Sequence, residues 1–260
     1  MLAQHPYCRE AGDGELIVCL HASTSSSRQW RDLMAHMGAS HRIIAPDLAG
    51  HGRNEWHGDG DAVEEDVRLL DALAGASKAH LVGHSYGGAV ALRYALRYPQ
   101  RVLSLSLYEP AAWHLADDEV RDVGLGIMRV AASGHPEAAA RRFIDYWNGA
   151  GSFERMESAQ QARVVAQMPR VVAHFAALFA DATPLHVYAT LDAPALLLSG
   201  RSGPRCGPQV AEILSDTLPR AGALCLPDLG HMGPISAPAR VNGIIARFVE
   251  QHVPAKAYGA

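Results

Sequence analysis

The chain has 260 residues, of which 48% are hydrophobic and 19% are charged. This balance is typical of a folded globular protein and excludes a disordered chain. The formal net charge is -4 and the arginines are scattered along the sequence, which argues against a nucleic-acid partner.

The sequence also disfavours a membrane protein and a metalloprotein. No apolar run reaches the roughly 20 residues that span a bilayer, and the first residues show no secretory signal. Cys8, Cys19, Cys206 and Cys225 lack the spacing of metal ligands, and the 14 histidines are dispersed. We therefore expect reduced thiols, a cytoplasmic protein, no membrane partner and no metal.

Short apolar segments alternate with helix-like segments along most of the chain. This alternation predicts an α/β fold with a mainly parallel central sheet and helices on both faces. The predicted strands cover residues 16–20, 42–45, 79–82, 102–107, 195–198 and 223–226. The predicted helices cover residues 62–73, 87–97, 208–218 and 240–251.

The interval from residue 111 to residue 191 contains no convincing strand. Apolar residues recur there at helical spacing, and the interval holds four of the five phenylalanines, Phe143, Phe153, Phe175 and Phe179. We expect residues 1–110 and 192–260 to form the core and residues 111–191 a helical lid. The aromatic side chains either seat this lid on the core or cover an apolar pocket, and the two roles are compatible.

The segment after the predicted strand 79–82 reads Gly83-His84-Ser85-Tyr86-Gly87-Gly88 and leads into a predicted helix. This is the G-x-S-x-G pattern in its strand-turn-helix context, which exposes a nucleophilic serine on a strained turn. The flanking glycines avoid collisions with the neighbouring strand and helix. Ser85 is therefore the predicted nucleophile, and the helix N-terminus beneath it favours an oxyanion.

With this motif the chain resembles the α/β-hydrolase superfamily, in the lidded branch of esterases, cofactor-free perhydrolases, haloalkane dehalogenases and carbon–carbon bond hydrolases. The other segments that carry the resemblance are LHAS at 20–23, APDLAGHG at 45–52, LYEP at 107–110 and GHMGP at 230–234. The resemblance implies the α/β-hydrolase fold. No phosphate loop or dinucleotide motif is present, so no organic cofactor is expected. A serine nucleophile, where dehalogenases and epoxide hydrolases use aspartate, disfavours those activities.

The same resemblance assigns the base and the oxyanion hole. His231 follows the last predicted strand, where this superfamily places its catalytic histidine. The oxyanion hole would use the backbone N–H groups of Tyr86 and Ser23. The family's usual His-Gly pair is replaced here by His21-Ala22.

The third member of the triad is less obvious, because the loop from Gly200 to Arg205 has no carboxylate where the family usually carries an aspartate. Glu109 follows the strand 102–107, which should neighbour the nucleophile strand, and some relatives take their acid from this position. Asp228 is the alternative, although it lies only three residues before His231. We predict Glu109 as the acid.

These residues predict a serine hydrolase of a small to medium, uncharged and largely apolar carboxylic ester or related acyl compound. The alternatives are carbon–carbon bond hydrolysis or perhydrolysis on the same triad, and a non-catalytic receptor that retained the pocket. The partner is expected to be a small molecule. The sequence leaves the substrate and the oligomeric state open.

Overall fold

The computed structural model describes residues 6–56, 58 and 60–253. The strands are β1 (Cys8–Ala11), β2 (Glu15–Leu20), β3 (His41–Pro46), β4 (Ala79–His84), β5 (Val102–Tyr108), β6 (Ala195–Gly200) and β7 (Ala221–Leu226). The core helices are α1 (Arg31–Met37), α2 (Ala62–Ala74), α3 (Tyr86–Arg97), α8 (Cys206–Thr217), α9 (Gly233–Ser236) and α10 (Pro238–Glu250). Between β5 and β6 lie α4 (Asp118–Ala132), α5 (Pro136–Asn148), α6 (Ser158–Ala180) and α7 (Leu185–Tyr188).

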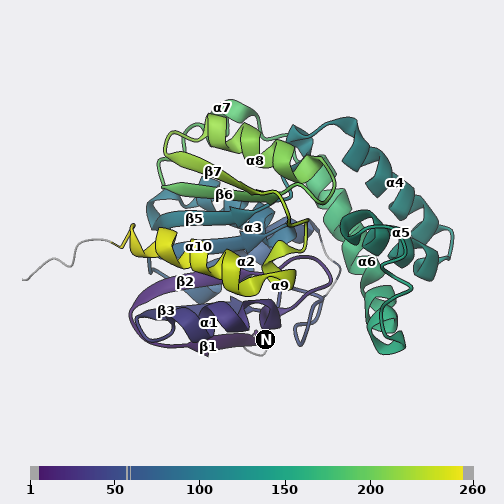
Figure 1. Ribbon diagram of the computed structural model, residues 1–260, viewed down its shortest axis with the longest axis horizontal. Coiled ribbons are helices and arrows are strands. Elements are labelled where there is room, and N and C mark those ends of the chain that lie inside the picture. The colour runs from purple at the N-terminus through teal and green to yellow at the C-terminus, as the bar shows by residue number, and fades with distance from the viewer. Residues whose placement is uncertain (1–5, 57, 59, 254–260) are drawn as a thin grey trace, which may run out of the picture.

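The strands form one sheet in the order β1-β3-β2-β4-β5-β6-β7 (Figure 1). Only β1 is antiparallel to its neighbour, and each of the other described pairs is parallel. The carboxyl ends of six strands therefore meet at one edge of the sheet, which is where α/β folds place their sites. The predicted mainly parallel sheet is confirmed.

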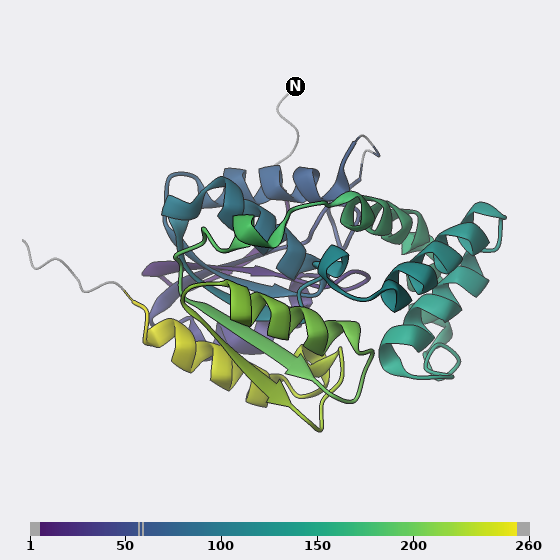
Figure 2. The same ribbon diagram turned by 90° about the horizontal axis from the view of Figure 1, so that it is seen from above.

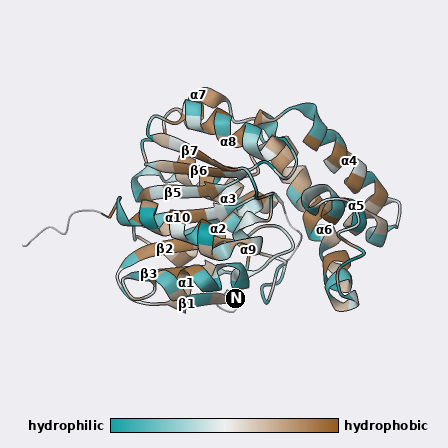
Figure 3. Cartoon of the chain, viewed as in Figure 1, coloured by the Kyte–Doolittle hydropathy of each residue, from teal (hydrophilic) through white to brown (hydrophobic). Residues whose placement is uncertain are grey.

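Helices cover both faces of this sheet. On one face, α1 and α10 pack against strand residues such as Ile17 and Ile43, and they lie together in front of the sheet in Figure 1. On the other face, α2, α3 and α8 pack against residues such as Val18 and Leu105. Figure 3 shows hydrophobic residues along the strands and hydrophilic ones on outer helix faces. Burial of these apolar faces holds the layers together.

The helices α4, α5 and α6 project beyond the sheet as a separate group (Figure 2). They pack on one another and join the same hydrophobic cluster as α2 and α3, through residues such as Phe143, Val171 and Phe175. Residues 111–191 are thus a mainly helical insertion between two adjacent strands. Its helices α4, α5 and α6 lie beyond the edge of the sheet where the strands end, whereas α7 lies beside α8 (Figure 1).

All six predicted strands and all four predicted helices are present, with ends shifted by a few residues. In the core, the predictions missed β1, α1 and the short α9. The sequence of β1 is CREA, and its half-exposed position at the sheet edge requires no apolar run. No helix among the described residues is long and apolar enough to cross a membrane. Within the same residues, the four cysteines are unpaired and no cluster of potential metal ligands occurs.

Candidate active site

Ser85 occupies a strained turn between β4 and α3. Its backbone has φ 54° and ψ -118°, a region that costs a residue with a side chain of order 1–3 kcal/mol. Among the described residues, Thr24 and Glu109 are the other non-glycine residues with positive φ, and both lie close to Ser85 in the fold. The three strained residues therefore lie close together around Ser85. A side chain at Gly87 would collide with the backbone of Leu20, so the turn requires glycine there.

The structure brings Ser85, His231 and Glu109 into one hydrogen-bonded chain. His231 Nε2 lies 3.0 Å from Ser85 Oγ, and His231 Nδ1 lies 2.7 Å from Glu109 Oε2. All three residues are buried. Both distances are within the range of a nucleophile bound to its base and of that base bound to an orienting carboxylate.

The carboxylate of Glu109 is fixed on both sides. Its Oε1 accepts a hydrogen bond of 2.8 Å from the backbone N–H of Gly200, at the end of β6. A side chain at Gly207 would overlap Oε2, so glycine at the start of α8 leaves the carboxylate its space. The loop that lacks the usual aspartate therefore contributes a backbone donor to the carboxylate instead.

The alternative acid, Asp228, does not approach His231. Its carboxylate accepts hydrogen bonds of 2.6 and 2.7 Å from Arg240, and both side chains are largely exposed. Only Leu229 and Gly230 lie between Asp228 and His231, which is too short a loop to turn Asp228 back onto the imidazole. Asp47 braces its own loop by accepting from the N–H groups of Ser27 and Arg53 at 2.7 and 2.9 Å.

The residues that precede Ser85 and Glu109, His84 and Tyr108, bind the loop that carries His231. Nε2 of His84 donates to the carbonyl of His231 at 2.8 Å, and the Tyr108 hydroxyl donates to the carbonyl of Gly230 at 2.8 Å. Gln29 extends this chain, since its amide lies 3.1 Å from His84 Nδ1 and its oxygen accepts from Ala22 N–H at 3.3 Å. No sequence pattern indicated Gln29, because its partner His84 lies 55 residues away on β4.

Ser23 and Tyr86, the predicted oxyanion residues, meet at a cluster of buried histidines. Ser23 Oγ lies 2.7 Å from Nδ1 of His174 on α6, and the His174 ring stacks on Tyr86 at 3.5 Å between centroids. Burial, together with the neighbouring His51, lowers the pKa of His174 well below its ordinary value. His174 is thus a neutral imidazole that fixes both predicted residues, and sequence analysis did not identify it.

A buried ion pair connects the insertion to the strained turn at residues 83–88, which we call the elbow. Arg170 on α6 lies 2.9 Å from Asp66 on α2, and Asp66 accepts a further hydrogen bond of 2.7 Å from the Tyr86 hydroxyl. Arg170 also pairs with Glu65 at 2.9 Å. Charges buried at this depth persist only when they are paired and hydrogen-bonded, so this network sets where α6 sits over Ser85.

A narrow pocket lies directly at Ser85. Its volume is ≈ 30 Å³. It is lined by Ala22, Ser23, Thr24, Ser85, Trp113, Phe143, Ile144, Trp147, Asn148, His231 and Met232. Trp147 packs on the imidazole of His231 at 4.2 Å between centroids and stacks on Trp113 at 5.3 Å. The insertion thus supplies apolar walls that exclude water from the imidazole.

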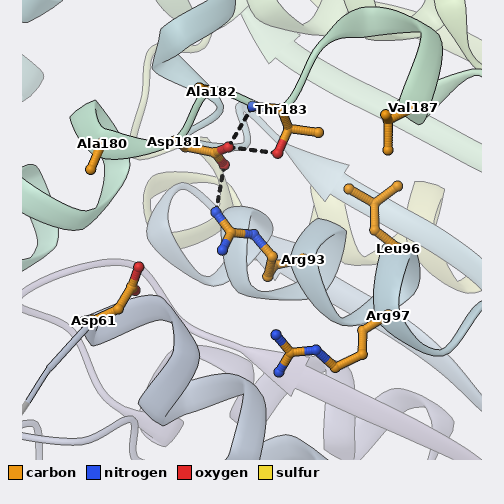
Figure 4. Close-up of a pocket in the computed structure, with 9 residues that line it drawn as sticks. All are labelled: Asp61, Arg93, Leu96, Arg97, Ala180, Asp181, Ala182, Thr183 and Val187. Atoms are coloured by element: carbon orange, nitrogen blue, oxygen red, sulfur yellow. Dashed lines mark hydrogen bonds and ion pairs between the residues drawn. The ribbon is translucent and has the colours of Figure 1, made fainter.

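A larger hollow of ≈ 450 Å³ lies away from Ser85, between α3 and the segment after α6 (Figure 4). Its charged groups neutralise one another. Arg93 binds Asp181 at 2.8 Å and Glu64 at 3.0 Å, and Arg97 binds Glu64 at 2.6 Å. Thr183 donates to Asp181 at 2.6 Å. Since these partners already satisfy the charges, the hollow is a structural junction.

Comparison with known proteins identifies the family. A sequence model described as "alpha/beta hydrolase fold" matches residues 15–238. The chain belongs to the alpha/beta hydrolase family. It is 27% identical to the 2-hydroxymuconate semialdehyde hydrolase of Pseudomonas sp. (strain CF600), over 93% of this chain and 89% of that protein.

Solved structures agree with this fold. The structure of MGS-M2, an alpha/beta hydrolase from a Medee basin deep-sea metagenome library, superposes with a TM-score of 0.81 at 20% identity, covering 96% of each chain. A thermophilic esterase from Thermogutta terrifontis superposes with a TM-score of 0.76 at 23% identity, covering 95% of this chain and 94% of the other. At these identities the likeness concerns the fold, and the homologues are hydrolases.

The separate hydrogen bonds of the two Glu109 carboxylate oxygens predict the effect of Glu109→Gln. The amide oxygen will stay with Gly200 N–H, so the NH₂ group will face His231 Nδ1 and force the imidazole into the tautomer that cannot accept a proton at Nε2. We expect turnover of a short-chain ester to fall by about 10⁴-fold, as in a comparable triad change. Steady-state kinetics measure this loss, and Asp228→Asn is the control that should leave turnover unchanged. Equal effects of the two substitutions would contradict the assignment.

The buried histidines predict a loss of stability in mild acid. Burial lowers the pKa of His21 to about 4 and of His51 to about 3, and it lowers those of His84 and His174 well below their ordinary value. Below an unfolded pKa of about 6.5 the unfolded chain binds protons that the folded chain does not. The free energy of unfolding should therefore be highest above about pH 6.5 and fall towards about pH 4, by up to about 1.4 kcal/mol per histidine and pH unit.

Urea unfolding at several pH values across this window measures the slope. Burial raises the pKa of Asp66 to about 6, which acts with the opposite sign and offsets one of the four histidines. His51→Gln should reduce the slope by about one proton, whereas His36→Gln, at an exposed position of α1, should not change it. A stability that does not decline between about pH 6.5 and pH 4 would contradict the neutral state of these residues.

Proposed function

We propose that the chain is a serine hydrolase that cleaves a carboxylic ester with a small, uncharged and largely apolar acyl group. The observation that carries the proposal is the chain of contacts from Ser85 Oγ through the His231 imidazole to the Glu109 carboxylate, with separations of 3.0 and 2.7 Å. Such a chain raises the reactivity of a serine hydroxyl, which is a weak nucleophile when it stands alone.

In the proposed reaction, Ser85 Oγ attacks the ester carbonyl while His231 Nε2 accepts the hydroxyl proton. Glu109 holds the Nδ1–H tautomer and stabilises the imidazolium. The N–H groups of Tyr86 and Ser23 bind the oxyanion of the tetrahedral intermediate. Its collapse breaks the bond to the alcohol, which leaves with the proton from His231. Water activated by His231 then attacks the acyl-enzyme and releases the carboxylic acid.

The pocket at Ser85 supports a small and apolar acyl group. Its volume of ≈ 30 Å³ has room for only a few atoms, and its walls include Trp113, Phe143 and Trp147. Apart from His231, none of its lining residues among the described part of the chain has a side chain that can carry a charge. In this role the helical insertion acts as a lid that closes on the acyl group and excludes water.

Carbon–carbon bond hydrolysis is the second candidate. The similarity to the Pseudomonas semialdehyde hydrolase extends over 93% of this chain, and the same three residues can serve both reactions. The two candidates separate in one assay that offers the enzyme short-chain esters and ring-cleavage products of the semialdehyde type. The ester proposal expects faster turnover of the esters.

A fluorophosphonate probe tests the nucleophile, because it labels an activated serine and distinguishes a hydrolase from a receptor. We expect labelling at Ser85 and none in Ser85→Ala. The substitution should also lower ester turnover by about 10⁴-fold or more while leaving thermal unfolding nearly unchanged. Ser199→Ala, at a buried serine of β6, is the matched control that should retain labelling. Wild-type turnover in purified Ser85→Ala would contradict the proposal.

The packing of Trp147 on His231 predicts that Trp147 limits the length of the acyl chain. Trp147→Ala should shift the preferred 4-nitrophenyl ester from acetate to longer acyl chains such as hexanoate, because it removes one wall of the pocket. Its turnover of acetate should fall, since water gains access to the imidazole. Rates across a series of chain lengths measure the shift, and Trp56→Ala, which lies outside the pocket, is the control. An unchanged preference would show that Trp147 does not limit the acyl chain.

A further inference from the structure

A third cavity lies beside the catalytic pocket and differs from it in size and charge. Its volume is ≈ 770 Å³, and it is bounded by β1, by the loops that follow β2 and β3, and by α6. Four of its lining residues are arginines: Arg9 on β1, Arg28 after β2, Arg53 after β3, and Arg163 on α6. We call it the arginine groove.

These arginines carry charge that the described part of the chain does not neutralise. None of the four forms an ion pair there, whereas Arg93, Arg97 and Arg170 each bind a carboxylate. Asp47 is the one carboxylate among the residues lining the groove. It is buried, and both of its oxygens already accept backbone N–H groups. The groove thus presents an excess of positive charge.

Parts of the groove are already ordered for a ligand. The Arg53 guanidinium lies 4.3 Å from the centre of the Tyr7 ring, which restricts its position. Arg9 Nε is buried and has no hydrogen-bond partner among the described residues. A buried donor without an acceptor is costly, so the charge and hydrogen-bonding capacity of Arg9 remain unused within the protein.

The groove adjoins the nucleophile through Thr24. This residue lines both the arginine groove and the pocket that contains Ser85. Its N–H donates to His51 Nε2 at 3.1 Å and its φ is 61°, so its backbone position is fixed. A substrate whose acyl group fills the narrow apolar pocket can therefore place its other half in the arginine groove.

We propose that the arginine groove binds a phosphate carried by the alcohol or thiol that leaves during hydrolysis. Arginine donates paired hydrogen bonds to phosphate oxygens. Among the described residues that line it, the groove has four guanidinium groups and only one buried carboxylate, that of Asp47. This excess of positive charge is larger than a ligand with a single carboxylate group would need. This assignment of the groove rests on the proposed function. It keeps the expectation of an uncharged group for the acyl half of the substrate only. The acyl group is apolar, and the leaving group is anionic.

Three acetyl esters of similar shape test this assignment. They are 4-acetoxyphenyl phosphate, 4-acetoxybenzoate and 4-methoxyphenyl acetate, which carry a phosphate, a carboxylate and a neutral group. We expect KM for the phosphate to be lower than for the neutral ester by about tenfold, which corresponds to about 1.4 kcal/mol. Raised ionic strength should remove this difference. Equal KM values for the three, or the lowest for the carboxylate, would overturn the proposal.

Arginine variants distinguish an effect of the arginine groove on KM from an effect of the protein's overall charge. Combined Arg28→Gln, Arg53→Gln and Arg163→Gln, all at exposed positions, should raise KM for the phosphate ester to that of the neutral ester without changing kcat for the neutral one. Arg220→Gln, exposed at the start of β7 and hence at the opposite edge of the sheet, is the control and should change neither. A triple variant that keeps the preference for phosphate would overturn the proposal.

A binding measurement distinguishes failure of this proposal from failure of the proposed function. Calorimetry of phenyl phosphate with Ser85→Ala requires no turnover, and we expect binding that the triple arginine variant loses. If esters are not hydrolysed but phenyl phosphate binds, the proposed function fails and the groove stands. If esters are hydrolysed and phenyl phosphate does not bind, the groove proposal fails alone.

Discussion

The register between β4 and β5 is the constraint on which the candidate site depends. Gly83 pairs with Leu107 and His84 with Tyr108, so the next residue on each strand, Ser85 and Glu109, leaves the sheet at the same level. A hydrogen bond of 3.0 Å from Ser85 N–H to the Tyr108 carbonyl also joins the turn at Ser85 to the end of β5. With Ser85 and Glu109 side by side in this way, one histidine between them completes the hydrogen-bonded chain. The end of β6 then presents the N–H of Gly200 to that carboxylate.

The histidine arrives from the far end of the chain, 122 residues after Glu109. Its placement therefore depends on donors that the same two strands provide, from His84 and Tyr108 to the carbonyls of His231 and Gly230. The neutral state of His84 matters for this arrangement. A charged imidazole here would oppose the charge that His231 would gain in the proposed reaction, and burial prevents this by lowering the pKa of His84.

The sequence predicted the parts of the site that arise from local or adjacent structure. The elbow is encoded within six residues, and Glu109 followed from the expectation that its strand neighbours the nucleophile strand. Gln29 and His174 escaped prediction because their roles exist only where separate segments pack together. His174 meets Ser23 across 151 residues of sequence. No spacing rule links such positions without knowledge of how α6 sits over the loop after β2.

The clustering of the groove arginines could not be predicted from the sequence for the same reason. In the sequence they are dispersed and the net charge is -4, which gave no reason to expect an anion site. The fold brings Arg9, Arg28, Arg53 and Arg163 from four segments to one cavity while their counterparts on α3 are neutralised by carboxylates. Exposed arginines without partners cost little, because water solvates them. Their concentration beside Ser85 is informative because Asp47, the one carboxylate among the described residues that line the cavity, already accepts backbone N–H groups. Net charge therefore excludes nucleic-acid surfaces better than it excludes a small anionic ligand, whose recognition depends on a few groups within one cavity.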